Sequence, residues 1–195
     1  MNTEQISDTQ VTGKNRVCPW QHVSTFDNFL RPLFHNPRKL FGPYVHKGMA
    51  VMDVGCGRGF ASLGFAQLVG ETGLVIAADL QPEMLEMVKQ RAAKAGLSDR
   101  IRFHRCEADR IGVKAELDFA LAFWMFHEVP DGRAFLEEIF ALLKPGGRLF
   151  IVEPKMHASR SDFEHAVDEA REIGFTVSER PRVLFSRAVV LAKNA

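Results

Sequence analysis

A short apolar run, Met49 to Val54, ends in three glycines at alternate positions, Gly55, Gly57 and Gly59. An apolar segment able to form a helix, Phe60 to Val69, follows directly. A strand that turns sharply into a helix presents unpaired backbone N–H groups and the positive end of the helix dipole at one place. Glycine suits such a turn because a Cβ would hold a ligand away from the backbone. We therefore expect a nucleotide-like ligand above the end of this strand.

A plain tight turn is the alternative for this loop, so the motifs that follow it matter. Leu74 to Asp79 is a second apolar run that ends in a carboxylate, roughly 20 residues beyond the glycines, where a ribose-binding acid is expected. A carboxylate only accepts hydrogen bonds and has two oxygens, which suits the two ribose hydroxyls. Capping the helix behind Pro82 is a second role compatible with the first. Further on, Leu142 to Ile151 contains a helix end, a Pro-Gly-Gly turn and a new strand.

In this order the motifs closely resemble those of the class I S-adenosylmethionine-dependent methyltransferases. The shared features are D-x-G-x-G-x-G starting at Asp53, the acid Asp79, and L-K-P-G-G starting at Leu143. The resemblance is dense from Met49 to Val152 and looser elsewhere. It implies an α/β fold: a doubly wound, Rossmann-like sheet of seven strands, mostly parallel with a C-terminal antiparallel strand. It also implies S-adenosylmethionine as the cofactor.

The rest of the chain alternates between strand-like and helix-like segments, which is typical of a parallel sheet covered on both faces. Ser161 and Asp162 are expected to cap a helix that runs to about Ile173. The remaining predicted elements are a helix at 82–95, strands at 101–106 and 117–123, a helix at 131–143, a strand at 147–152 and a closing hairpin within 175–191.

The resemblance also implies which residues hold the cofactor. They are Asp53, Gly55, Cys56, Gly57, Gly59, Asp79, Leu80, Glu107, Ala108 and Phe123. Asp53 is expected to hold the loop and the methionine end of the cofactor, and Leu80 to contact the adenine. Relatives often carry Asp-Ala where this chain has Glu107-Ala108, so Asp109 is an alternative acceptor for the adenine amino group, and a solvated loop acid is another. Cys56 is interpreted as a small filler of the loop, not a nucleophile.

The methyl acceptor is expected beyond the end of the fourth strand, at Phe123 to Glu128, because ligands of such sheets bind beyond the carboxyl ends of the strands. His127 is the residue there that can take a proton near neutral pH, and we predict it as the catalytic residue. A purely structural histidine is the alternative. Glu153 and His157, just past the fifth strand, rank below it. Sulfur and neutral nitrogen acceptors need no base.

Length and composition restrict the domain organisation and the partners. A chain of 195 residues suits one domain, which we place at 49–195 behind an N-terminal tail and helical cap at 1–48. The net charge of +1 gives no electrostatic attraction to nucleic acid or to an anionic membrane, and no apolar run is long enough to span a membrane. The three cysteines lack metal-ligand spacing, so we predict no metal site. A cytoplasmic location is expected, and the oligomeric state stays open.

Several acceptor classes are disfavoured at the end of the fourth strand. The sequence Phe-Trp-Met-Phe at 123–126 lacks the Asn-Pro-Pro-Tyr type of run found in enzymes that act on amino groups of bases or on protein glutamine. It also lacks the carboxylates of metal-dependent catechol-type enzymes. The chain is most similar to the branch that includes ubiquinone and menaquinone methyltransferases, which implies a small, partly apolar acceptor. A non-catalytic S-adenosylmethionine-binding protein is the alternative. A nicotinamide-dependent oxidoreductase is disfavoured because Phe60 replaces its third glycine.

Overall fold

The computed structural model describes residues 36–194, and the strands and helices within this range have the following bounds. The strands are β1 (Ala50–Val54), β2 (Leu74–Asp79), β3 (Ile101–Arg105), β4 (Leu117–Phe123), β5 (Leu143–Pro154), β6 (Phe175–Glu179) and β7 (Ser186–Lys193). The helices are α3 (Pro37–Phe41), α4 (Phe60–Val69), α5 (Pro82–Lys94), α6 (Gly132–Leu142) and α7 (Arg160–Ile173), with short 3-10 turns η1 (Ser98–Arg100) and η2 (Phe126–Glu128).

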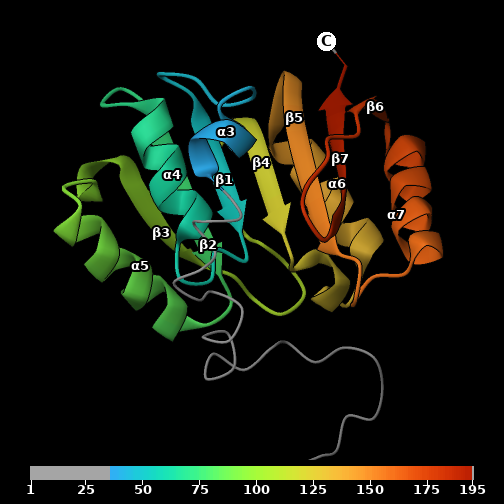
Figure 1. Ribbon diagram of the computed structural model, residues 1–195, viewed down its shortest axis with the longest axis horizontal. Helices are drawn as coiled ribbons and strands as arrows, with labels where there is room; N and C mark the ends of the chain where they lie inside the picture. Colours follow the sequence, from blue (N-terminus) through green and yellow to red (C-terminus); the bar gives the residue numbers. More distant parts are fainter. Residues whose placement is uncertain (1–35, 195) are drawn as a thin grey trace, which may run out of the picture.

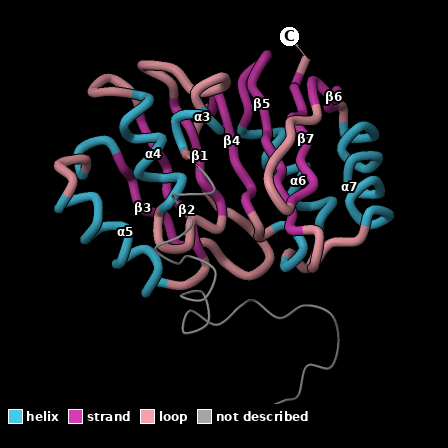
Figure 2. The backbone as a smooth tube through the Cα atoms, in the orientation of Figure 1, coloured by secondary structure: helices cyan, strands magenta, loops and turns pink. Residues whose placement is uncertain are grey.

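All seven strands belong to one sheet in the order β3-β2-β1-β4-β5-β7-β6 (Figures 1 and 2). The pairs from β3 through β5 are parallel. Strand β7 runs antiparallel to both of its neighbours, β5 and β6. The predicted fold is therefore confirmed: a doubly wound, mostly parallel seven-stranded sheet with an antiparallel strand at the C-terminus.

Successive residues of the central strands supply opposite faces of the sheet, because strand side chains alternate. On one face Val51 packs with Phe65 of α4 and Val88 of α5. On the other face Met52 packs with Leu136 of α6 and, within the same cluster, Val167 of α7. Both faces of the central strands are consequently buried, which explains why these strands read as continuous apolar runs.

Two element boundaries differ from the sequence prediction. Helix α7 begins after Ser159, whose hydroxyl accepts the N–H of Asp162 at 3.1 Å, so the predicted cap at Ser161 is wrong by two residues. Both serines precede the same apolar pattern, so the cap was ambiguous in sequence. Strand β5 begins at Leu143, because that residue already pairs with Leu117 before a register shift. The Pro-Gly-Gly segment thus lies within the strand as an irregularity.

Residues 36–48 pack onto the face of the sheet that α4 covers, and Figure 1 shows α3 next to α4. Phe41 is fully buried, and its ring lies 4.8 Å from that of Phe65. Tyr44 stacks on Phe119 of β4. The N-terminal tail and cap predicted at 1–48 fall mainly on residues 1–35, outside the described residues, so the division into a cap and a domain stays a prediction.

Candidate functional site

The carboxyl ends of β1 to β5 meet at one edge of the sheet, where the arrow of β4 ends in Figure 1. Strand order reverses between β1 and β4, since β2 and β3 follow on one side and β5 on the other. In open α/β sheets a crevice for ligands opens at such a switch point. The predicted site residues lie at the carboxyl ends of β1 to β4 or in the loops that follow these strands.

The glycine loop after β1 gives each of its three glycines a different environment. A Cβ at Gly55 would lie 2.8 Å from Met125, and one at Gly59 would lie 2.9 Å from Val88, so packing excludes side chains at both positions. A Cβ at Gly57 would have no atom within 4 Å, although the residue has a left-handed φ of +50°. The middle of the loop therefore presents bare backbone to open space, as a closely approaching ligand requires.

Asp79, at the end of β2, is joined to this loop. One carboxylate oxygen accepts the N–H of Gly57 at 2.9 Å, and the other accepts the N–H of Gln81 at 2.9 Å. Burial raises the pKa of the Asp79 carboxyl, while these backbone N–H groups act in the opposite direction. A carboxylate offers about four lone-pair sites, so both oxygens keep capacity for a pair of ribose hydroxyls.

Two further residues of the loop region, Asp53 and Cys56, are buried. Asp53 in β1 is 3% exposed and accepts the hydroxyl of Ser62 in α4 at 2.5 Å, which fixes the start of the helix against the strand. Burial, followed by the nearby charges of Asp53 and Asp79, raises the pKa of the Cys56 thiol well above its ordinary value. The thiol is therefore neutral at physiological pH, which agrees with a filling role.

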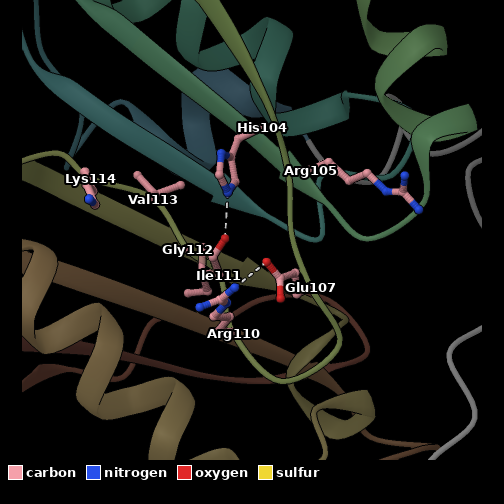
Figure 3. A pocket seen from close by; sticks show the side chains of 8 residues that line it. All are labelled: His104, Arg105, Glu107, Arg110, Ile111, Gly112, Val113 and Lys114. Atoms are coloured by element: carbon pink, nitrogen blue, oxygen red, sulfur yellow. Dashed lines mark hydrogen bonds and ion pairs between the residues drawn. The ribbon is translucent and has the colours of Figure 1, made fainter.

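Beyond β3 the chain forms an open groove of about 300 Å³ lined by basic side chains and by Glu107 (Figure 3). Glu107 is exposed, and its carboxylate accepts from Arg110 at 2.5 Å. Glu138 of α6 holds the far side of the loop through the N–H groups of Ile111 and Gly112. One oxygen of Glu107 contacts Arg110 and the other keeps acceptor capacity, and its predicted role with the adenine amino group, like those of Ala108 and Asp109, stays a prediction.

The loop after β4 is organised by a buried carboxylate from β5. Glu153 is 1% exposed and accepts the backbone N–H groups of Phe126 and His127 at 3.1 and 3.0 Å. One of its oxygens also lies 2.6 Å from Nδ1 of His127. A carboxylate can only accept, so Nδ1 carries the proton and Nε2 is left as the basic nitrogen.

The contact with Glu153 changes the pKa of His127. Burial lowers the pKa of its imidazole, but the hydrogen bond and the negative charge of Glu153 outweigh burial and raise the pKa above the ordinary value. Glu128 adds to this effect, with one oxygen 3.9 Å from Nε2. The ring of His157 stacks against that of His127 with centroids 5.4 Å apart. The arrangement can stabilise an imidazolium formed when His127 takes up a proton.

Aromatic side chains form the wall between the glycine loop and this histidine. Phe123 is buried, and its ring centroid lies 6.4 Å from that of Phe60 and 5.3 Å from that of Trp124. Trp124 has a left-handed φ of 60°, and its indole N–H donates to the hydroxyl of Ser186 at 2.9 Å. A bulky residue in this conformation is uncommon and occurs mostly at functional sites.

Two contributors to the site were ranked low or missed from the sequence. Glu153 was placed below His127, although an acid that ends the apolar strand segment Leu149 to Val152 signals a buried carboxylate with specific partners. Met125 lies against Gly55 and thereby joins the β4 loop to the glycine loop, a contact without any local signal.

The fold and the joined glycine loop and acid define a nucleotide-binding α/β domain of the S-adenosylmethionine-dependent methyltransferase type. The chain belongs to the methyltransferase domain family, whose model matches residues 45–184. Over 110 residues it is 32% identical to the ubiquinone/menaquinone biosynthesis C-methyltransferase UbiE of Haemophilus ducreyi, an alignment that covers 56% of this chain and 42% of UbiE. The chain thus spans less than half of that relative's length.

Solved structures agree with this assignment. A SAM-dependent methyltransferase from Aquifex aeolicus superposes with a TM-score of 0.80 at 25% identity, over 91% of this chain and 100% of that one. The cyclase SpnF has the same fold, with a TM-score of 0.69 at 18% identity over 80% of this chain and 79% of its own. The predicted family and its S-adenosylmethionine cofactor are confirmed.

The residues present fit this cofactor, because Gly57 leaves a bare backbone surface next to the free acceptor capacity of Asp79. Within residues 36–194 no helix has the length and apolar character needed to cross a bilayer. The same residues contain no cluster of metal-ligating side chains.

Proposed function

We propose that this chain transfers a methyl group from S-adenosylmethionine to a small, partly apolar acceptor by in-line displacement. When bound, the cofactor supplies a methyl group already activated by a positively charged sulfur, so the protein mainly has to bind and align the two reactants. The observation that carries the proposal furthest is the 2.6 Å contact between His127 and the buried carboxylate of Glu153.

In this proposal the cofactor half of the site comprises the ten predicted residues at the carboxyl ends of β1 to β4 and in the loops after them. In this proposal Gly57 provides the backbone surface along which the cofactor passes, and Asp79 accepts its ribose hydroxyls. The support is the left-handed, open geometry of Gly57 and the 2.9 Å hydrogen bond that ties Gly57 to Asp79. Asp53 and Ser62 keep the strand and the helix in register below them.

The acceptor half lies at the end of β4, where His127 acts as general base through Nε2. Glu153 fixes the tautomer and the ring orientation through Nδ1, and it stabilises the imidazolium that forms when the acceptor loses its proton. Such a base is needed for a hydroxyl or a carbon acid, but not for a thiolate or a neutral amine. We therefore infer that the acceptor carries a weakly acidic O–H or C–H group.

The acceptor's partly apolar character is supported by the aromatic wall of Phe60, Phe123 and Trp124. The relatives are named as C-methyltransferases of ubiquinone and menaquinone biosynthesis. A hydroquinone or phenol fits both observations, because its ring can stack on aromatic side chains and its hydroxyl can lose a proton to His127.

A first test is calorimetric titration of the full chain with S-adenosylmethionine, S-adenosylhomocysteine and NADH. Micromolar binding of the first two without the third supports the proposal, and binding of NADH alone overturns it. A screen of phenols, hydroquinones, thiols and amines with labelled cofactor then tests the acceptor class. If the acceptors were thiols or amines and His127→Ala transferred the methyl group as fast as the wild type, His127 would not be a general base.

A second candidate function is binding of S-adenosylmethionine without transfer of its methyl group. The [4+2]-cyclase SpnF has the same fold and is named for a different reaction, so the fold is compatible with chemistry other than methyl transfer. Tight cofactor binding together with no labelled product for any acceptor in the screen would favour this non-catalytic alternative.

A further inference from the structure

Three exposed side chains gather beside the acceptor half of the site. Among residues 36–194, the large hydrophobic side chains left exposed are Met156, Phe185 and Leu184, at 90%, 67% and 48%. Met156 follows β5, and the other two precede β7. The N–H of Lys155 donates to the carbonyl of Phe185 at 3.0 Å, so the two loops are joined. We call Met156, Leu184 and Phe185 the rim patch.

The rim patch is continuous with the acceptor site. Ser186, next to Phe185, pairs with Pro154 across the sheet, and its hydroxyl accepts the indole N–H of Trp124. Met156 lies three residues beyond Glu153, which positions His127. The rim patch therefore lies on the loops next to Glu153 and Trp124, beside the proposed acceptor half of the site.

Phe185 is held outward by its backbone. Its φ is +58°, a conformation that costs roughly 1 to 2 kcal/mol for a residue with a Cβ. Exposed apolar surface and a strained backbone at one residue are both unfavourable in an isolated monomer, and strain of this kind concentrates at functional positions. Exposure and backbone strain together indicate that the Phe185 side chain contacts an apolar partner outside the chain.

Basic side chains flank the rim patch. Lys155, Arg160 and Arg182 are exposed, and none of them has a carboxylate partner within the described part of the chain. Of two nearby acids, Glu164 is neutralised by a bidentate pair with Arg180 at 2.7 and 2.9 Å, whereas Asp162 accepts the hydroxyl of Ser159 and keeps its charge, one negative charge against three positive ones. The border of the patch thus carries an excess of positive charge.

The area and the charge of the rim patch together indicate what kind of partner binds there. A whole aromatic side chain has a surface of about 150 to 250 Å², so the three partly exposed side chains together present an apolar surface of a few hundred Å². A stable dimer buries roughly 800 Å² on each partner, which is more than this patch provides. A small apolar surface ringed by Lys and Arg matches the boundary between headgroups and acyl chains of an anionic bilayer. We propose that the rim patch docks on an anionic lipid surface and turns the acceptor opening toward it.

Flotation of the full chain with phosphatidylglycerol–phosphatidylcholine vesicles, without any acceptor, tests this proposal separately from the proposed function. The wild type should float with these vesicles, should float less with pure phosphatidylcholine, and should be released by high salt. The double variant Met156→Ser/Phe185→Ser should bind about tenfold more weakly or worse. Lys155→Ser/Arg182→Ser should lose several-fold, and only on the anionic vesicles.

Lys89→Ser/Lys94→Ser is the matched control, because it removes two exposed lysines from α5, away from the patch, and should bind vesicles like the wild type. Calorimetry with S-adenosylmethionine and a melting curve show that each variant is folded. Absence of wild-type flotation, or equal flotation of the wild type and Met156→Ser/Phe185→Ser, would overturn the proposal. A wild-type dimer in sedimentation velocity that this variant abolishes would also overturn it, by assigning the patch to a second copy.

Discussion

The backbone N–H of Gly57 donates to the carboxylate of Asp79 at 2.9 Å, although the two residues lie 22 positions apart. The hydrogen bond joins the loop after β1 to the end of β2, so the two predicted parts of the cofactor site form one unit. The contact has a consequence for mutation. A change at either residue disturbs both the loop conformation and the group expected to meet the ribose.

Gly57→Ala should abolish or strongly weaken binding of S-adenosylmethionine, because the new Cβ occupies the open space expected to hold the cofactor. Gly96→Ala is a matched control, since Gly96 also has a left-handed φ, of +66°, and no atom within 4 Å of a built Cβ. Both variants should lose about 1 kcal/mol of unfolding free energy. Calorimetry should separate them, and equal cofactor affinity in both would remove Gly57 from the site.

Asp79→Ala should weaken cofactor binding by about 10- to 100-fold, the effect of losing a hydrogen bond to a charged group. Asp99→Ala, on an exposed 3-10 turn, should leave the dissociation constant unchanged. In the wild type, burial raises the pKa of the Asp79 carboxyl. Acidification should therefore weaken cofactor binding at a higher pH than for an ordinary aspartate. If Asp79→Ala bound S-adenosylmethionine with normal affinity, the ribose would not be bound by Asp79.

The pH dependence of turnover should report the pairing of His127 with Glu153. A general base must be neutral, and Glu153 raises the pKa of His127 in the free protein, so kcat/KM should rise with pH through a value above that of ordinary histidine. Glu153→Gln keeps the shape but removes the charge, and should shift this rise to lower pH and reduce the maximum.

Cofactor affinity should be unchanged in Glu153→Gln, which distinguishes positioning from misfolding. His165→Ala, on the exposed face of α7, is the control and should match the wild type at every pH. If Glu153→Gln and the wild type had identical pH profiles, His127 would have a structural role and would not be the general base.

Phe185→Asn should raise the unfolding free energy relative to Phe185→Ala. Both variants remove the same exposed ring, but Asn adopts a left-handed backbone with little cost, whereas Ala retains most of the strain. A difference of about 0.5 to 1 kcal/mol in denaturant unfolding is expected. Equal stability of the two variants would mean that the backbone at 185 carries no strain.

The local signals in the sequence predicted a parallel sheet, and the resemblance of their order to that of a known family implied the seven-stranded fold and the cofactor. Apolar runs ending in glycines, an acid or a Pro-Gly-Gly turn gave the parallel strands, and the order of these motifs gave the family. The cap of α7 was misplaced from Ser159 to Ser161, because two serines with equal local propensity precede the same helix. Local sequence does not choose between such neighbours, since packing of Phe163 and Val167 fixes the helix register.

The candidate site divides in the same way. The sequence by itself determined that Gly57, Asp79 and His127 lie at or just past the carboxyl ends of strands, and their roles in the site stay predictions. Only the tertiary structure decided that Glu153 of β5 holds His127 and that Met125 lies against Gly55. Those contacts depend on the register of β4 against β5 and on the order of strands in the sheet, which arise from packing across the whole domain.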